Sequence, residues 1–275
     1  MNLRDQHVLI TGGSSGIGLA LALAVAARGA RVSLVGRDPA KLASARETIR
    51  AAHPSTAVFT APADVSRAAE INAALAAAEK THGPVDVLVT SAGVARPGYF
   101  EEVPVEVFER TMAVNYLGTV YPLKEVVPAM RRRRHGAVVL VSSGAGLCGL
   151  FGYTPYSPSK FALRGLAESL RAELQGSGVH VMIVYPPDTD TPQLAEENRT
   201  KPVETRALTA GAGLWSAEAV ARATLDGLDR KRFAVTPGLP LTALYWLQSV
   251  LAPVLRWSFD RTARRARAAA GPSAR

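Results

Sequence analysis

The chain has 275 residues, of which 48% are hydrophobic, and its formal net charge at pH 7 is +9. This length allows one large α/β domain or two small ones, and the hydrophobic content is ample for one buried core. The single cysteine, Cys148, excludes an intramolecular disulfide and suits a reducing compartment such as the cytoplasm. Because no long Gly/Ser/Pro-rich linker divides the first 230 residues, we expect one domain at 1–232 and an extension at 233–275. The N-terminus shows no signal-peptide pattern.

Short β-branched runs alternate along the chain with alanine-rich amphipathic stretches. The expected strands cover residues 7–11, 31–36, 57–62, 85–91, 137–142 and 179–185. The expected helices cover residues 16–28, 39–52, 66–82, 104–133, 156–176 and 216–230. Apolar strands separated by helices of this length predict an α/β fold: a doubly wound parallel sheet of the Rossmann type with helices on both faces. Such sheets bind ligands at the carboxyl ends of their strands.

A glycine-rich turn follows the first expected strand. Glycines lack a Cβ atom, so backbone there can approach a pyrophosphate, and the next helix supplies unpaired N–H groups at its N-terminus. A glycine cluster alone is a weak signal, but the strand–turn–helix context indicates a dinucleotide site. The residues that we expect to hold the nucleotide are Gly12, Ser14, Ser15, Gly16, Ile17 and Gly18.

The end of the second expected strand bears on the choice of nucleotide. A carboxylate there would bind a ribose 2′-hydroxyl and repel a 2′-phosphate. The chain has Arg37 instead, with Lys41 one helical turn further on, so the sequence favours NADPH over NADH. Asp38 is the nearby carboxylate, and it could cap the next helix. After the third strand, Asp64 and Val65 could hold the adenine ring, while Asp64 could also be an ordinary helix cap.

Ser143, Tyr156 and Lys160 form a candidate acid catalyst, and we predict no metal site beside it. Tyrosine has an ordinary pKa of about 10. The ammonium of Lys160, four residues after Tyr156 and so on the same helix face, should lower that pKa and could also reach the ribose. Ser143 ends the preceding strand and could donate a hydrogen bond to a carbonyl oxygen as charge develops there. Together with the glycine turn, these residues predict a reductase that protonates a ketone.

These motifs resemble those of the short-chain dehydrogenases/reductases, over residues 7 to about 232. The resemblance implies that Tyr156 is the proton donor, with Lys160 as its partner and Ser143 orienting the carbonyl. It also implies that Asn115 joins a proton relay through a water, although an asparagine here could simply bond backbone within a helix. A homodimer or homotetramer is implied as well, paired through the helices at 104–133 and 156–176.

Two segments depart from the pattern of that family. The usual Asn-Asn-Ala-Gly is Thr90-Ser91-Ala92-Gly93 here, so we carry over only Ala92 and Gly93 to the nucleotide site. The usual Pro-Gly after the sixth strand is Pro186-Pro187. The residues after that strand that we expect at the nucleotide are Pro186, Thr189 and Thr191. The two threonines are placed to bond a nicotinamide carboxamide, or else to cap helices.

Residues 185–202 are similar to the substrate loop of the 3-ketodihydrosphingosine reductases, and 149–152 and 161–168 also resemble that family. The resemblance implies NADPH-dependent reduction of 3-ketosphinganine to sphinganine. Another lipid ketone, such as an N-acyl-3-ketosphinganine, a steroid or a 3-oxoacyl compound, would need the same catalytic residues, and a nucleotide sensor without turnover is a further alternative. Glu196 and Glu197 could contact the substrate amine, unless they are surface carboxylates.

The C-terminal segment carries no charge between Arg232 and Arg256, and the last twenty residues then hold six arginines against one aspartate. Pro237, Pro240 and Pro253 interrupt the apolar part, so its helical portion, expected near 241–252, is too short to span a bilayer. We favour a helix lying in the interface of an anionic membrane, which would make the protein peripheral on a cytoplasmic face. Burial against the domain or an oligomer partner, and a true span, are the alternatives.

A second basic run, at 131–134, ends an expected helix, where cations suit the helix dipole. Neither basic run is accompanied by the interleaved aromatic residues of a nucleic-acid groove, so we predict no nucleic-acid partner.

Overall fold

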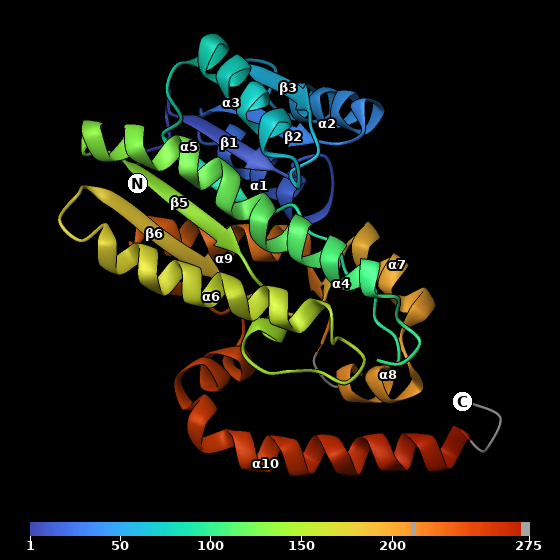
Figure 1. Ribbon diagram of the computed structural model, residues 1–275. Coiled ribbons are helices and arrows are strands. Elements are labelled where there is room, and N and C mark those ends of the chain that lie inside the picture. The colour runs from blue at the N-terminus through green and yellow to red at the C-terminus, as the bar shows by residue number, and fades with distance from the viewer. Residues whose placement is uncertain (211–212, 271–275) are drawn as a thin grey trace.

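The computed structural model describes residues 1–210 and 213–270 (Figure 1). Its main sheet has seven strands in the order β3-β2-β1-β4-β5-β6-β9, and every neighbouring pair is parallel. The strands are β1 (His7–Thr11), β2 (Arg31–Gly36), β3 (Val58–Pro62), β4 (Val87–Thr90), β5 (Gly136–Val141), β6 (Val179–Val184) and β9 (Ala234–Val235). The predicted doubly wound parallel sheet is confirmed.

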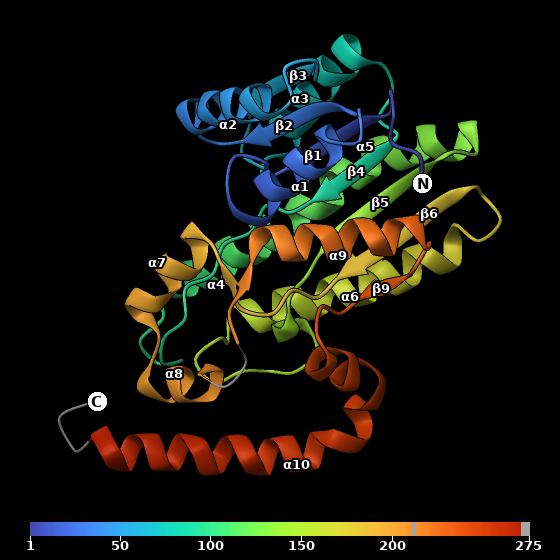
Figure 2. The ribbon, with the colours of Figure 1, turned by 180° about the vertical axis from the view of Figure 1, so that it is seen from behind.

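Helices cover both faces of this sheet, as Figures 1 and 2 show from opposite sides. One face carries α1 (Gly16–Ala26), α2 (Pro39–Ala52) and α9 (Ala217–Asp229). The other face carries α3 (Ala68–His82), α5 (Gly118–Arg133) and α6 (Tyr156–Glu173). Because both faces are buried, the strands are apolar at nearly every position rather than at alternate ones.

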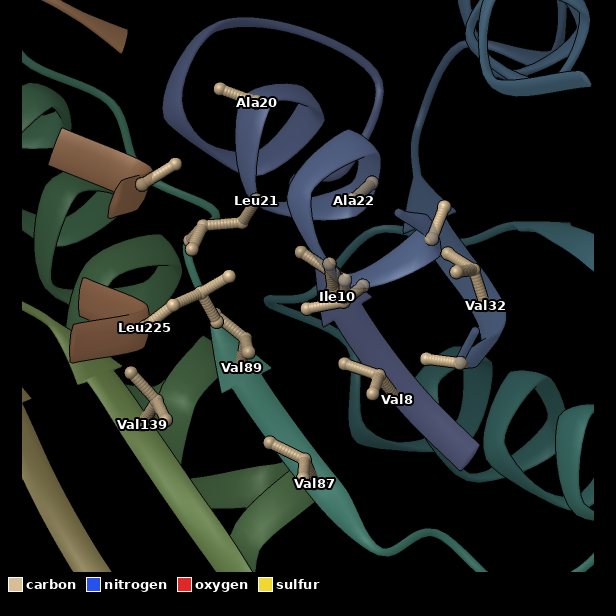
Figure 3. Packing of buried hydrophobic residues seen from close by; sticks show 14 of the residues in the cluster. Val8, Ile10, Ala20, Leu21, Ala22, Val32, Val87, Val89, Val139 and Leu225 are labelled. Atoms are coloured by element: carbon tan, nitrogen blue, oxygen red, sulfur yellow. The ribbon is translucent and has the colours of Figure 1, made fainter. Parts of the chain in front are cut away.

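Alternate residues of each strand contribute to two separate cores. In β1, Val8 and Ile10 belong to the core under α1 and α9, whereas Leu9 belongs to the core under α3 and α5. Figure 3 shows the first core, where Leu21 of α1 and Leu225 of α9 lie over the central strands. These two layers hold the strand ends rigidly, and the turns after the strands are the parts that reach a ligand.

The strand order reverses between β1 and β4, which are neighbours in the sheet but not in the chain. The turns after these two strands pack directly against each other. Gly12 has a φ of +70°, and a Cβ atom there would lie 2.7 Å from the Cα of Ala92. A side chain at Gly12 would therefore push the two turns apart. This is the point at which a sheet of this kind opens a ligand crevice.

The helix expected over 104–133 is divided in the structure. It consists of α4 (Val105–Met112), a π-helical segment η1 (Ala113–Leu117) and α5. Asn115 lies within η1 and is fully buried. Single π-helical turns of this type are frequent at functional sites, because they redirect a side chain without ending the helix.

The segment after β6, which we read as a long loop, contains two helices. These are α7 (Pro192–Thr200) and α8 (Val203–Thr209), and a small second sheet pairs β7 (Thr189–Asp190) with β8 (Trp215–Ser216). Helix α7 begins with two standard start signals. The hydroxyl of Thr191 accepts a hydrogen bond from the Leu194 N–H at 3.2 Å, and Pro192 occupies the first helical turn.

The C-terminal helix is longer than predicted. Helix α10 (Leu239–Ala270) contains the whole expected stretch and continues through Pro253 into the arginine-rich part. A proline inside a helix removes one backbone hydrogen bond and bends the helix, and Figures 1 and 2 show α10 bent before its long straight part. Strand β9 joins the main sheet, so the part of the extension outside the sheet begins at Leu239. Among residues 1–210 and 213–270, no helix combines the length and apolarity needed to cross a membrane.

Candidate active site and nucleotide site

One cavity of about 680 Å³ lies at the carboxyl ends of the strands. It brings together every residue that we predicted for the nucleotide and the acid catalyst, with the exception of Asn115. The predicted residues that line it are Gly12, Ser14, Ser15, Gly16, Ile17, Gly18, Arg37, Lys41, Asp64, Val65, Ala92, Gly93, Ser143, Tyr156, Lys160, Pro186, Thr189 and Thr191. The turns that supply them come from chain positions up to 180 residues apart, and the parallel sheet is what aligns them.

The glycine turn after β1 is too tight for side chains. A Cβ atom on Gly18 would lie 2.2 Å from the carbonyl oxygen of Gly12, and Gly16 has a φ of +52°. Ser15 precedes α1 but makes no side-chain cap, so no cap side chain occupies the N-terminus of that helix. Open N–H groups at a helix N-terminus, beside backbone without side chains, suit the pyrophosphate of a dinucleotide. The turn therefore fits such a cofactor.

The end of β2 presents two cations to the same cavity. Arg37 and Lys41 are both exposed and both line it. Asp38 is engaged elsewhere, because its Oδ1 accepts hydrogen bonds from the N–H groups of Ala40 at 2.9 Å and Lys41 at 3.2 Å. The interpretation of Asp38 as the cap of α2 is confirmed. An anionic group bound at this end would meet positive side chains and a carboxylate that is already hydrogen-bonded.

Asp64 is not the helix cap that we considered as its alternative role, because α3 begins after Arg67. Its carboxylate instead accepts hydrogen bonds from Ser66 and from Arg110, the latter at 2.8 Å. Burial tends to raise the pKa of Asp64, but these hydrogen bonds and the Arg110 charge outweigh it and hold the pKa at about 2. Asp64 is thus a fixed anion at the rim of the cavity, beside Val65.

Tyr156 and Lys160 lie in the first turns of α6, and Lys160 Nζ is 5.5 Å from the centre of the Tyr156 ring. Pro158 falls in the first turn of the helix, where it is tolerated. Burial lowers the pKa of Lys160 to about 8, against the charge of Glu197, which raises it. The Lys160 ammonium donates a hydrogen bond to the carbonyl oxygen of Val141 at 3.0 Å, which fixes it beneath the cavity.

The expected direction of the Tyr156 pKa is wrong for this structure. Burial raises the pKa of the phenol and the charge of Glu197 raises it further, while hydrogen bonds from Ser143 and Gln193 only partly oppose them. The spacing of Tyr156 and Lys160 reveals the nearby ammonium but not the desolvation of the phenol, which is the largest effect here. The phenol is therefore protonated at neutral pH and can act as a proton donor.

Asn115 lies behind the cavity wall and fastens two parts of the site together. Its Nδ2 donates to the carbonyl oxygen of Val94 at 3.0 Å and to the hydroxyl of Ser159 at 2.9 Å, and its Oδ1 accepts from the Val94 N–H at 2.9 Å. These bonds run from η1 to the turn after β4 and to α6. We had considered that the Asn115 side chain only bonds the backbone of its own helix. It instead forms hydrogen bonds with two other elements.

Thr189 and Thr191 both line the cavity, as predicted, but they also have local partners. The Thr189 hydroxyl donates to the carbonyl oxygen of Pro187 at 2.8 Å, and Thr191 caps α7. A Cβ atom on Gly16 would lie 3.0 Å from the Thr191 methyl group. The start of α7 thus closes directly over the glycine turn.

A polar group made of Tyr153, Gln193 and Glu197 lies on another wall of the cavity; the sequence had indicated Glu197 but neither of its two partners. Glu197 accepts hydrogen bonds from the Tyr153 hydroxyl at 2.7 Å and from Gln193 Nε2 at 2.8 Å. Glu196, its neighbour and fellow candidate, is exposed and pairs with Arg199 at 2.9 Å. The start signal of α7 could have revealed this group, because it places Gln193 and Glu197 four residues apart on one helix face.

The remaining wall of the cavity is apolar and comes largely from α10. The residues of α10 that line it are Pro240, Leu241, Leu244, Leu251, Leu255 and Phe259. We expected this segment at a membrane, with burial against the domain as the alternative. The structure shows that one side of α10 borders the cavity, while the side chains of Trp246, Val250 and Trp257 are mostly exposed.

A parallel Rossmann-type sheet whose crevice holds a phosphate-binding turn and a buried Tyr–Lys pair is the architecture of an oxidoreductase that acts on ketones or alcohols. Residues 6–202 match the short chain dehydrogenase family, and the chain belongs to that family.

Relatives in animals and plants carry more specific names. The chain is 42% identical over 257 residues to a 3-dehydrosphinganine reductase of Danio rerio. The aligned residues are 92% of this chain and 77% of that protein. It is 43% identical over 255 residues to a 3-ketodihydrosphingosine reductase of Bos taurus, with the same coverage of 92% and 77%. A 3-dehydrosphinganine reductase of Arabidopsis thaliana is 39% identical over 237 residues, which are 85% of this chain and 70% of that protein.

Solved structures of short-chain dehydrogenases share the fold. One from Sphingobium yanoikuyae in complex with NADPH has a TM-score of 0.78 and 27% identity, covering 91% of this chain and 95% of its own. One from Burkholderia phymatum in complex with NAD has a TM-score of 0.83 and 25% identity, covering 93% and 96%. Both nucleotides thus occur in this fold, so the choice between them depends on the residues at the end of β2.

Proposed function

We propose that the protein reduces the ketone of 3-ketosphinganine with NADPH and so forms sphinganine. The main structural support is that a single cavity joins the protonated phenol of Tyr156 to the long apolar wall of α10. A ketone on a long alkyl chain needs both, because the chain gains about 0.8 kcal/mol per buried CH₂ from an apolar surface. The relatives named 3-dehydrosphinganine or 3-ketodihydrosphingosine reductase support the same substrate.

In the proposed reaction, Ser143 donates a hydrogen bond to the carbonyl oxygen, and Tyr156 gives its proton to that oxygen as the alcohol forms. The nucleotide, when bound, supplies the hydride that the carbonyl carbon receives. The phenolate that remains is stabilised by the nearby Lys160 ammonium, whose Nζ is 5.5 Å from the Tyr156 ring. Asn115 belongs to the relay that restores the proton, and its bonds to Val94 and Ser159 hold it in place.

The preference for NADPH is assigned to Arg37 and Lys41. Both are exposed in the cavity at the end of β2, where the 2′-phosphate of the adenosine ribose would lie. Guanidinium and ammonium groups bind phosphate through charge-assisted hydrogen bonds, and NADH lacks the group that they would meet. The glycine turn, Asp64, Val65, Ala92, Gly93, Pro186, Thr189 and Thr191 complete the proposed nucleotide site.

The reaction is tested by following NADPH oxidation with 3-ketosphinganine in detergent micelles. We expect turnover with NADPH, little with NADH, and a loss of about 10²- to 10⁴-fold in the Tyr156→Phe variant, because the proton donor is removed. Tyr185→Phe is a suitable control, since the buried Tyr185 hydroxyl has no hydrogen-bond partner among the described residues and Tyr185 does not line the cavity. If the protein reduces only N-acylated, steroid or 3-oxoacyl ketones, the substrate is wrong. If NADPH binds and no ketone is reduced, the sensor alternative replaces the enzyme.

The proposal includes attachment to an anionic membrane through α10. The outward side of this helix exposes Trp246, Val250, Val254 and Trp257, which are 56–76% accessible. Exposed arginines follow them along the same helix, at positions 256, 261, 264 and 265. Aromatic side chains enter the lipid interface and arginines are attracted to anionic headgroups. Because the other side of α10 lines the cavity, attachment would place the substrate entrance near the lipid.

Membrane attachment is tested with the full chain and with vesicles of phosphatidylcholine, with or without phosphatidylserine. We expect binding to the anionic vesicles, reduced at least tenfold in a Trp246→Ser/Trp257→Ser variant and weakened by Arg264→Gln/Arg265→Gln. The charge control is Arg46→Gln/Arg50→Gln on α2, which lies at the far end of the molecule from α10 (Figure 1). Equal binding of all variants to the vesicles would show that these residues of α10 do not attach the protein. No binding by the unaltered protein would exclude membrane attachment altogether, including attachment to a cytoplasmic membrane face.

We also propose that the expected division at 1–232 and 233–275 moves toward the C-terminus, so that β9 stays with the nucleotide-binding domain and α10 forms the membrane-associating extension. A homodimer or homotetramer assembled through α5 and α6 is proposed as well. Sedimentation in detergent measures the assembly directly. A monomer under conditions that sustain turnover would exclude the oligomer.

A further inference from the structure

One carboxylate in the cavity has no cationic partner. Glu197 is only 7% exposed, and its two oxygens accept hydrogen bonds from the Tyr153 hydroxyl and from Gln193. Within residues 1–210 and 213–270, no Lys, Arg or His nitrogen lies within the ion-pair distance of 4.0 Å from it. Glutamates are rarely buried unless they are paired, because desolvation of the charge is costly. A cation brought by a ligand would supply the missing partner.

Two other charged groups of the cavity wall, Asp188 and Lys160, are already engaged. Asp188 lies 3.7 Å from the buried ammonium of Lys201, which itself stands over the Tyr153 ring. Lys160 donates to the Val141 carbonyl oxygen, and its pKa, which burial lowers, is raised by the charge of Glu197. Glu197 therefore acts on the catalytic groups at a distance without being neutralised by them.

The position of Glu197 relative to the reacting phenol is defined by its two hydrogen-bond donors, Tyr153 and Gln193. Gln193 lowers the pKa of the Tyr156 phenol, and its Nε2 donates a hydrogen bond to Glu197 at 2.8 Å. Tyr153, whose hydroxyl donates to Glu197 at 2.7 Å, has its ring centre 5.6 Å from that of Tyr156, so the carboxylate and the phenol lie in the same part of the cavity. In 3-ketosphinganine the ammonium is on the carbon next to the carbonyl. A ketone bound at Tyr156 would bring that ammonium within reach of Glu197.

We propose that Glu197 is the binding group for the substrate ammonium, and that Tyr153 and Gln193 orient its carboxylate. This inference rests on the proposed function and specifies how the site distinguishes a free amine from an acylated one. An ionised carboxylate has about four lone-pair positions, and the two protein donors use two of them. The remaining positions can accept hydrogen bonds from the ammonium. An N-acylated ketone would leave the buried charge unpaired, so the site selects against it.

The experiment compares two ketones, 3-ketosphinganine and its N-acetyl derivative, which is neutral at that nitrogen. The quantity measured is the ratio of kcat/KM for the free amine to that for the acetylated ketone. We expect Glu197→Gln to lower this ratio by about 10- to 100-fold, the range for a lost hydrogen bond to a charged group. The matched control is Glu196→Gln, which removes an exposed carboxylate one position away on the same helix. It should leave the ratio unchanged.

The pH profile for the acetylated ketone provides a second reading, since that substrate has no amine to titrate. Activity should fall as the pH rises through the pKa of Lys160, which is about 8 in the unaltered protein. Because the charge of Glu197 raises that pKa, Glu197→Gln should move the fall to lower pH. This shift reports the charge of Glu197 beside Lys160, whereas the ratio of the two ketones reports its contact with the ammonium.

The outcomes separate the two proposals. An unaltered enzyme that turns over 3-ketosphinganine while Glu197→Gln keeps the same ratio overturns the ammonium site alone. An unaltered enzyme that does not accept 3-ketosphinganine overturns the proposed function as well. Should Glu197→Gln fail to fold, inhibition of the unaltered enzyme still decides: sphinganine must inhibit at least about tenfold more strongly than N-acetylsphinganine. Equal inhibition by the amine and by its amide would reject the site.

Discussion

The nucleotide end and the lipid end of the cavity are built in different ways. The nucleotide end is made of short turns, each directly after a strand, at residues 12–18, 36–41, 64–65 and 92–93. The lipid end takes its residues from α7, α8 and α10, which lie beyond the sheet in Figures 1 and 2. One end therefore depends on the backbone geometry of single turns, and the other on how separate helices pack.

This difference determines what a substitution can do at each end. A turn that is closed by backbone contacts has no free space for another atom, so one added methyl group should displace the whole phosphate site. Helices that pack over an apolar cavity can shift slightly, and their substitution should change the affinity for the lipid while the nucleotide still binds. Substitutions at one end should therefore change the affinity for one ligand and leave the affinity for the other unchanged.

Gly18→Ala should disable the nucleotide end. The new Cβ atom would lie 2.2 Å from the Gly12 carbonyl oxygen, so the turn must open. We expect NADPH binding to weaken by about 100-fold or more and the free energy of unfolding to fall by about 1–3 kcal/mol. Isothermal titration and thermal unfolding measure both. Gly165→Ala is the control: it lies in α6 with nothing within 4 Å, so it should be neutral or slightly stabilising. Unchanged NADPH affinity in Gly18→Ala would mean that the turn is not the phosphate site.

Arg37→Asp should reverse the choice of nucleotide without altering the lipid end. The new carboxylate would repel a 2′-phosphate and could accept a hydrogen bond from a 2′-hydroxyl. We expect KM for NADPH to rise about 10- to 100-fold and KM for NADH to fall, with the lipid KM unchanged. Steady-state kinetics with each nucleotide provide the measurement, and Arg46→Asp on α2 is the control because it lies outside the cavity. An equal change for both nucleotides would contradict a specific 2′-phosphate contact.

The same contrast explains what could be predicted from sequence. Gly12, Tyr156 and Lys160 were identifiable because their roles follow from local spacing and from elements that begin within a few residues of them. Gln193 and Phe259 were not, since they reach the cavity only through the packing of α7 and α10 on the domain. The direction of the Tyr156 pKa also depended on burial, which spacing does not reveal. Local motifs thus report chemistry, whereas the shape of the substrate space depends on tertiary contacts.

Arg267→Met should loosen the lipid end. Arg267 Nε of α10 lies 2.5 Å from the carboxylate of Glu204 in α8, and its guanidinium stands over the Phe151 ring. Glu204 is fully buried and would retain Tyr99, its other side-chain donor, at 3.0 Å. We expect a loss of about 1–3 kcal/mol in unfolding free energy, from an under-satisfied buried charge, and a severalfold rise in the lipid KM.

The affinity for NADPH in Arg267→Met should stay within twofold or so of the unaltered value, because Arg267 does not line the nucleotide end. Arg264→Met removes an exposed arginine of the same helix and is the matched control. Equal losses of lipid and nucleotide affinity in Arg267→Met would show that the two ends are coupled, contrary to the separation argued above.

The smallest effect is expected at the opposite edge of the nucleotide half, where two buried histidines support β1 and β2. His7 Nδ1 donates to the Gly83 carbonyl oxygen at 2.7 Å, while Ser33 lies between His7 Nε2 at 2.8 Å and His82 Nδ1 at 3.3 Å. Burial, reinforced by the nearby His7 and Arg31, lowers the pKa of His82 to about 4. The unfolded chain, with an ordinary histidine pKa near 6.5, binds more protons between these values, so stability is lost as the pH falls from about 6.5 toward 4. Thermal unfolding should show a smaller fall in Tm between neutral and acidic pH in His82→Gln than in the unaltered protein or in His53→Gln. An equal fall in all three would assign the acid sensitivity to other groups.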